Sequence, residues 1–162
     1  MKTMMRAPAL LLAVGLVIWA AAAAQGQYGG GTEPSPPTQP GQPAQAGGKV
    51  ETQLRTAIDH AKNAAGSQAM AAAVSHLGHA LNCIEGTRGR NFNASWGHVC
   101  QGQGDGIYTD IRGQRNAESV MVVLESADGL ALAGVKAGHL AAVQNAARGV
   151  AALLQIVRDG LR

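Results

Sequence analysis

Apolar residues recur at helical spacing in four separate segments of this chain, and this periodicity constrains the fold more than any other feature. The segments span about residues 50–65, 68–85, 116–133 and 139–159. In each one, apolar side chains return every three or four residues, which places them on one face of an α-helix. Such a face must be buried against other helices. We therefore expect an all-α domain over residues 49–162.

The breaks between these segments indicate how the helices are connected. Gly66 and Ser67 separate the first two helices, and a glycine-containing break near residues 134–138 separates the last two. Ser67 and Asn116 are the expected N-caps of the second and third helices. Four amphipathic helices with short turns after the first and third predict an antiparallel four-helix bundle.

The segment between the second and third helices, residues 86–113, differs from the rest of the domain. Its seven glycines argue against regular helix, yet it holds the domain's aromatic residues, Phe92, Trp96 and Tyr108. Aromatic side chains bury a large apolar area when they pack. We therefore expect residues 86–113 to form an ordered cap on the helices, and this segment is called the cap below.

The N-terminus has the order of features that defines a secretion signal. Lys2 and Arg6 precede an apolar run from Ala9 to Ala24, which ends in small residues. This order predicts a signal peptide over residues 1–24, cleaved after Ala24. An uncleaved anchor is the alternative, but the run is shorter than the ~20 residues that span a bilayer. The mature protein is therefore expected in the periplasm or outside the cell, without a stable membrane span.

Residues 25–48 are rich in Gly, Pro and Gln and predict a disordered linker, because such a segment buries little apolar surface. The full chain has 13 Lys and Arg against 10 Asp and Glu, and two of the basic residues leave with the signal. The mature chain then carries 11 basic residues against 10 acidic ones, a net charge of +1. Without a basic stripe, nucleic acid is not an expected partner.

The domain contains two cysteines, Cys83 and Cys100. An exported protein meets an oxidising environment, so an intramolecular disulfide that staples the cap to the second helix is expected. The alternative is a reduced Cys83 acting as a metal ligand, since it lies four residues after His79 on the same helix face.

Two histidines of the second helix, His76 and His79, are three residues apart and therefore neighbours on the helix surface. They lie opposite the apolar stripe. The expected disulfide would bring His98, two residues before Cys100, toward the same face. Three imidazoles suit copper or zinc. The alternative is that the helix histidines are plain surface residues and that His98 hydrogen-bonds within the cap.

The remaining histidines, His60 and His139, are expected at the same end of the bundle. A second metal pair is one interpretation, and a capping or packing role is the other. Haem is not expected, because the chain has no Cys-x-x-Cys-His motif and Met70 and Met121 fit the core.

The string from His76 to Gly86, His-Leu-Gly-His-Ala-Leu-Asn-Cys-Ile-Glu-Gly, resembles exported bacterial helical proteins. It is similar in style to periplasmic small metal-binding proteins, which are four-helix bundles with histidines at helical spacing. The resemblance covers about residues 50–84 and, more loosely, 130–160. It implies few metal sites, with His76 and His79 as the matching residues.

No paired carboxylates or nucleophile with an adjacent base are readable, so an enzyme is not expected. The sequence favours an exported helical protein that binds a divalent transition metal. The alternative is an interaction or structural protein of the cell envelope. In that case Phe92 and Trp96 would contact a partner, with Arg88 and Arg90 at the rim of the surface.

Overall fold

The structure is a computed structural model that describes residues 46–162, and this part of the chain is all-helical. It contains five α-helices, one short 3₁₀ turn and no strands, which confirms the all-α prediction. The predicted signal peptide, 1–24, and residues 25–45 of the predicted linker lie outside the described residues. The elements are α1 (Ala46–Gly66), α2 (Met70–Glu85), the 3₁₀ turn (Ala94–Trp96), α3 (Ile107–Asp110), α4 (Ala117–Val135) and α5 (Leu140–Gly160).

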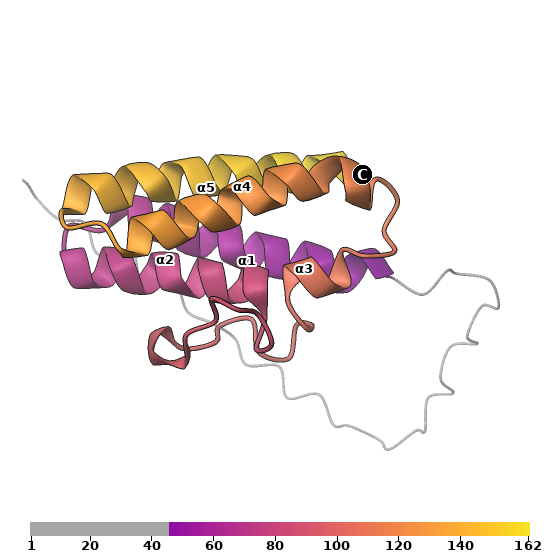
Figure 1. Cartoon of the computed structure of the whole chain (residues 1–162), viewed down its shortest axis with the longest axis horizontal. Coiled ribbons are helices and arrows are strands. Elements are labelled where there is room, and N and C mark those ends of the chain that lie inside the picture. The colour runs from indigo at the N-terminus through magenta and orange to yellow at the C-terminus, as the bar shows by residue number, and fades with distance from the viewer. Residues whose placement is uncertain (1–45) are drawn as a thin grey trace, which may run out of the picture. The chain divides into compact units, whose positions relative to one another are not determined.

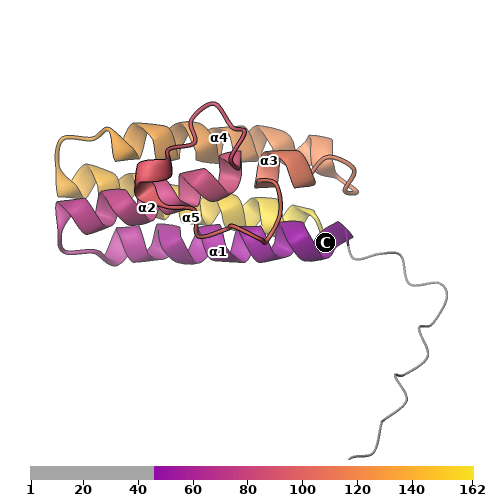
Figure 2. The same ribbon diagram turned by 90° about the horizontal axis from the view of Figure 1, so that it is seen from below.

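Four of the helices are long and lie side by side, as Figures 1 and 2 show from two directions. α1 contacts α2 and α5, and α4 contacts α5 and α2. The short α3 lies against α1 and α2. α2 and α5 also contact each other, and the α1–α2 pair, joined by a short turn, lies side by side along its length.

The core forms from the apolar stripes read in the sequence. All four long helices contribute fully buried side chains, and two more come from the cap. The largest apolar ones are Leu54, Ile58, Leu77, Leu81, Ile84, Ile107, Ile111, Leu124 and Leu154. Many of the remaining core residues are alanines. Because alanine has a small side chain, the helices can approach closely, and each larger side chain fills a space at native packing density.

Two helix starts differ from the prediction, and the side chain of one predicted N-cap, Asn116, has another partner. α1 begins at Ala46, within the predicted linker and ahead of the expected domain start at residue 49. α2 begins at Met70, because the Ser67 hydroxyl donates to the carbonyl of Asn63 at the end of α1 and does not cap α2. Asn116 precedes α4 with a left-handed φ of 66°, and its side chain donates to the Gly160 carbonyl, 3.0 Å away.

The cap is ordered, and the predicted disulfide between Cys83 and Cys100 is confirmed, with the two Cα atoms 5.4 Å apart. The reduced-thiol alternative is therefore wrong. The cap backbone crosses itself at Gly86 and Gly106, whose φ angles are 67° and 106°. A Cβ at either position would collide with the backbone of the other crossing segment, so both positions require glycine.

Two buried amide side chains anchor the cap to the helices. Gln53 of α1, which is fully buried, donates to Asp110 (2.7 Å) and accepts from the backbone N–H of Gly106 (3.0 Å). Asn82 of α2, also fully buried, does the same for the segment of residues 93–97, described below. Buried polar groups must be hydrogen-bonded, so each amide both needs and specifies its cap segment.

Of the described helices, α5 is the one whose length and hydropathy also match a membrane span. Its mean hydropathy reaches 1.3 over 18 residues, with a third of that window buried. Apolar core helices satisfy the same criterion, and α5 contacts both α1 and α4.

Candidate metal centre

Three histidines meet where α1 and α2 lie side by side. They are His60 of α1 and His76 and His79 of α2, all partly buried. One ring nitrogen from each lies within 4.8 Å of the other two. Among the described residues, this is the one group of three or more His, Cys, Asp or Glu side chains that is close enough to hold a metal ion.

The turn between α1 and α2 explains why these residues meet. His60 and His76 stand eight residues on either side of Gln68, in the middle of the turn. In two neighbouring helices joined by a tight turn, positions equally far from the turn face each other. His79 follows His76 by three residues and so occupies the same face of α2.

The nitrogen atoms are spaced as metal ligands are. The Nδ1 atom of His60 lies 3.2 Å from Nδ1 of His76 and 3.2 Å from Nδ1 of His79. Tetrahedral Zn²⁺ with Zn–N bonds of about 2.0–2.1 Å requires its ligand nitrogens to be about 3.3–3.4 Å apart. Two of the three spacings thus come close to this value without rearrangement, and His60 is the shared vertex.

The charge state of His60 suits a ligand. Burial lowers its pKa below the ordinary 6.5, and repulsion from His79 and His76 lowers it further, while nearby Asp59 acts in the opposite direction. A depressed pKa keeps the imidazole neutral at neutral pH, and metal binding needs the neutral ring.

The second ring nitrogen of His79, Nε2, faces the cap. Burial lowers its pKa, a hydrogen bond to the backbone of Trp96 raises it, and His76 lowers it, with a net decrease. A backbone carbonyl raises the pKa of a ring by accepting its N–H. The Nε2 atom faces this loop, since a Cβ placed at Gly97 would lie 3.4 Å from it. The arrangement leaves the Nδ1 lone pair of His79 directed at His60.

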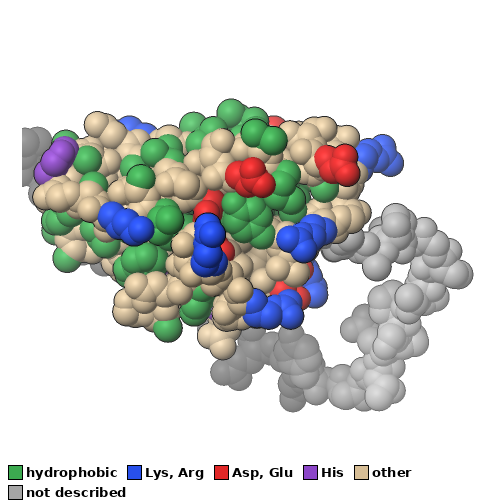
Figure 3. All heavy atoms as spheres, in the orientation of Figure 1, with side chains coloured by type: hydrophobic (Ala, Val, Ile, Leu, Met, Phe, Trp, Pro, Cys, Tyr) green, Lys and Arg blue, Asp and Glu red, His purple; other side chains and the backbone are tan. Residues whose placement is uncertain are grey.

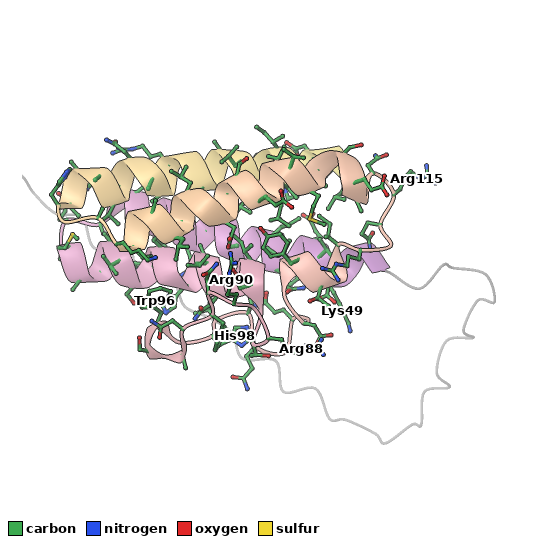
Figure 4. The ribbon with its side chains drawn as sticks, viewed as in Figure 1. Lys49, Arg88, Arg90, Trp96, His98 and Arg115 are labelled. Atoms are coloured by element: carbon green, nitrogen blue, oxygen red, sulfur yellow. A yellow bond between two sulfur atoms is a disulfide. The ribbon has the colours of Figure 1, made fainter. Side chains whose placement is uncertain are left out.

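The structure does not bring the predicted third ligand, His98, into this group. Its ring packs edge-on against Phe92, with 5.3 Å between ring centroids, and Figure 4 shows His98 within the cap. The disulfide brings the cap onto α2, but the 3₁₀ turn at residues 94–96 covers the helix near His79, and His98 falls beyond it. His60 takes the place expected for His98.

Two other predicted residues, Trp96 and His139, make contacts within the domain. Trp96, predicted to contact a partner, lies against α2: its indole occupies the space where a Cβ at Gly78 would be. Figure 4 shows this side chain beside the helix. His139 caps α5, since its Nδ1 accepts from the N–H of Ala142 at 3.2 Å, so the capping interpretation describes it and it does not pair with His60.

No family model, no curated protein and no solved structure matches this chain. These comparisons show no family for it.

A second cluster of ionisable groups lies between α2 and α4. The pKa of Asp128 is raised to about 7, first by burial and then by the charge of Glu85 and a hydrogen bond to it, while Arg90 acts in the opposite direction. Burial and nearby carboxylates also raise the pKa of Tyr108. These groups line a cavity of about 630 Å³ together with Asn91, Glu125, Gly129 and Leu132.

Sequence reasoning considered His60 as a ligand only with His139 and missed its convergence with His76 and His79, and it missed the Glu85–Asp128 pair altogether. The signal for His60 was present in its spacing, because it mirrors His76 across the turn. The carboxyl pair has no such signal. Glu85 and Asp128 are 43 positions apart in sequence, and they meet because α2 packs on α4.

Proposed function

We propose that this protein is exported and binds one divalent transition metal ion, Zn²⁺ or Cu²⁺, through His60, His76 and His79, without catalysing a reaction. The observation that carries the proposal is the convergence of three imidazole nitrogens, two pairs of which are 3.2 Å apart. Imidazole is a preferred ligand of both metals. Three neutral rings with converging Nδ1 atoms cannot all satisfy one another with hydrogen bonds, since each neutral ring carries a single N–H.

The scaffold supports the same proposal. We propose that the four long helices form the expected antiparallel bundle, so that the α1–α2 pair presents the site at a half-buried surface. Metal would enter from solvent and keep a fourth position for water or an exogenous ligand. The disulfide is consistent with an oxidising compartment, as the proposed export requires.

The charge distribution supports a small ligand over nucleic acid. On the face seen in Figure 3, Lys and Arg side chains lie apart from one another and acidic side chains lie among them. Binding of nucleic acid depends on a continuous basic surface. The packing of Trp96 on Gly78 gives this side chain a contact within the domain, next to the proposed ligand His79.

Calorimetric titration of the purified, chelator-treated protein with Zn²⁺ and Cu²⁺ tests this function. We expect one ion per chain, and an affinity at least about 100-fold weaker after His60→Ala, since loss of one of three ligands removes several kcal/mol of binding. His76→Ala and His79→Ala should behave alike. His98→Ala and His139→Ala are matched controls that should leave affinity unchanged. Absence of uptake at micromolar metal, or loss with His98→Ala in place of His60→Ala, contradicts the proposal.

A further inference from the structure

We propose that the cap segment of residues 93–97 positions the metal ligand His79, and that Asn82 is the residue that sets this segment in place. The inference rests on the proposed function, because it assigns a role toward the same metal. His79 forms a hydrogen bond with the backbone of Trp96. The Nδ1 atom of His79 lies 3.2 Å from His60 and its Nε2 faces Gly97, so we assign this bond to the Nε2–H and the Trp96 carbonyl, which leaves the lone pair on Nδ1.

Asn82 holds the segment by three hydrogen bonds, all made by its buried amide. Its Nδ2 donates to the carbonyls of Asn93 (2.8 Å) and Gly97 (2.7 Å), and its Oδ1 accepts from the N–H of Asn93 (2.9 Å). These contacts grip both ends of the 3₁₀ turn that carries Trp96. Asn82 follows His79 by three residues, so the clamp and the ligand share one face of α2.

The indole of Trp96 adds a second constraint. It lies against the backbone of α2 at Gly78, between the two metal ligands of that helix. Any side chain at residue 78 would displace it. The position of Trp96 is therefore fixed twice. The Asn82 amide holds the residues on either side of it, and the indole packs on Gly78.

The chemical consequence concerns the second ring nitrogen. Metal-bound histidines commonly donate their other N–H to a carbonyl or carboxylate, and loss of such a partner weakens metal binding by about 10–100-fold. Without the Trp96 carbonyl, the proton of His79 can occupy Nδ1, which turns the ligand atom into a donor. The cap thus affects metal affinity by determining which ring nitrogen of His79 carries the proton, and it does so without contacting the metal.

The chain offers a matched control for Asn82 in Gln53. Both are fully buried amides that clamp the cap to a long helix, but Gln53 holds the segment around Gly106 and Asp110, away from the histidines. Asn82→Ala and Gln53→Ala should both cost stability, because each leaves buried backbone groups unpaired. The two variants should differ in the tautomer of His79 and in Zn²⁺ affinity.

The first experiment is ¹⁵N NMR of the histidine rings in the metal-free wild-type protein, which reports the tautomer directly. We expect His79 as the Nε2–H tautomer in the wild type and in Gln53→Ala, and a mixture in Asn82→Ala. A wild-type His79 that is mainly the Nδ1–H tautomer overturns the inference. This measurement needs no metal, so it stands even if the protein takes up no Zn²⁺ and the proposed function fails.

The second experiment is Zn²⁺ titration of the same three proteins. Affinity should fall at least about 10-fold in Asn82→Ala and less than about 2-fold in Gln53→Ala. Equal losses in both would mean a purely structural role and overturn the inference. If Asn82→Ala does not fold, Asn82→Asp, which keeps the acceptor and removes both donated bonds, and Gly78→Ala, which displaces Trp96, replace it with the same expected loss.

Discussion

Two clusters of ionisable groups lie on opposite sides of α2. Burial lowers the pKa of histidines in one and raises the pKa of a carboxyl in the other, and both shifts favour the neutral form. On the α1 side, burial lowers the pKa of His60 and His79, so these rings lose their protons. On the α4 side, burial and the neighbouring Glu85 together raise the pKa of Asp128 to about 7, which favours its protonated form. A neutral imidazole offers a lone pair to a cation, whereas a protonated carboxyl paired with Glu85 does not.

The comparison shows why a count of potential ligands does not locate a metal site. The carboxyl cluster also offers several oxygen atoms, but the raised pKa of Asp128 favours its neutral form, and Arg90 lines the same cavity. The cap contacts both clusters, since Trp96 reaches His79 and Asn91 donates to Glu85 at 2.6 Å. Substitutions in the cap should therefore change the pKa values of both clusters.

The largest effect is expected from removal of the disulfide. Cys83→Ala with Cys100→Ala should lower the free energy of unfolding by about 3 kcal/mol, since the bond closes a loop of about 17 residues. Urea denaturation measures this, and ring NMR signals of His79 should shift in the same protein because the cap loosens on both flanks. A stability change well below 1 kcal/mol would mean that the buried amides hold the cap without the disulfide.

Metal should stabilise the fold through one cluster alone. Zn²⁺ at 100 times its dissociation constant should add about 2.7 kcal/mol, which corresponds to a rise of about 10 °C in Tm. Thermal denaturation should show this rise in the wild type and in Asp128→Asn, and no rise in His60→Ala. A rise that disappears with Asp128→Asn would place the metal on the wrong flank of α2 and break the comparison.

Asp128 should make stability depend on pH with a definite sign. Its pKa is about 7 in the folded protein and about 3.9 in an unfolded chain, so the folded state binds the proton more tightly. The stabilisation is complete below pH 4 and is lost as the pH rises to about 7. The Tm of Asp128→Asn minus that of the wild type should therefore increase from pH 5 to pH 8.

The histidines give the opposite dependence, because a lowered pKa means stabilisation that is present above pH 6.5 and lost as the pH falls. They occur in both proteins of this pair, so their contribution cancels in the difference. Glu118→Gln, an exposed change on the same helix, is the control. A difference in Tm that stays constant with pH would contradict the raised pKa of Asp128.

The smallest effect concerns the exposed neighbour of the metal site. Asp59 favours the charged form of His60, so Asp59→Asn should lower the pKa of His60 further. Asp59 does not contribute to the pKa shift of His79, which should stay unchanged. A pH titration of the ring proton signals by NMR measures both. Equal shifts of the two rings would show that the three histidines titrate as a single unit.

Much of the fold follows from local pattern. The stripes led by Leu54 in α1, Leu77 in α2 and Leu154 in α5 are buried as their spacing predicts, and the helix ends fall within a few residues of the expected positions. The disulfide followed from having two cysteines in a chain that was expected to be exported. The roles of Ser67 and Asn116 did not follow, because their side chains hydrogen-bond to α1 and to the end of α5, not to the helices they precede.

The site was predicted in part. His76 and His79 share a face because of helix geometry alone, so the sequence was sufficient to pair them. The choice of His60 over His98 as their partner depended on how far the cap reaches along α2, which a 3₁₀ turn and the Asn82 clamp determine. A glycine-rich segment has many accessible conformations, so local rules do not define its path.

By itself, the sequence determined the helices, their buried faces, the disulfide and two of the three converging histidines, because these depend on periodicity and on residue type. Only the tertiary structure decided which histidine completes the group, which carboxyls lie close together and which part of the cap lies next to His79. Those outcomes depend on distances between elements far apart in the chain. Packing of whole helices and of the cap sets such distances, and no local pattern of residues encodes them.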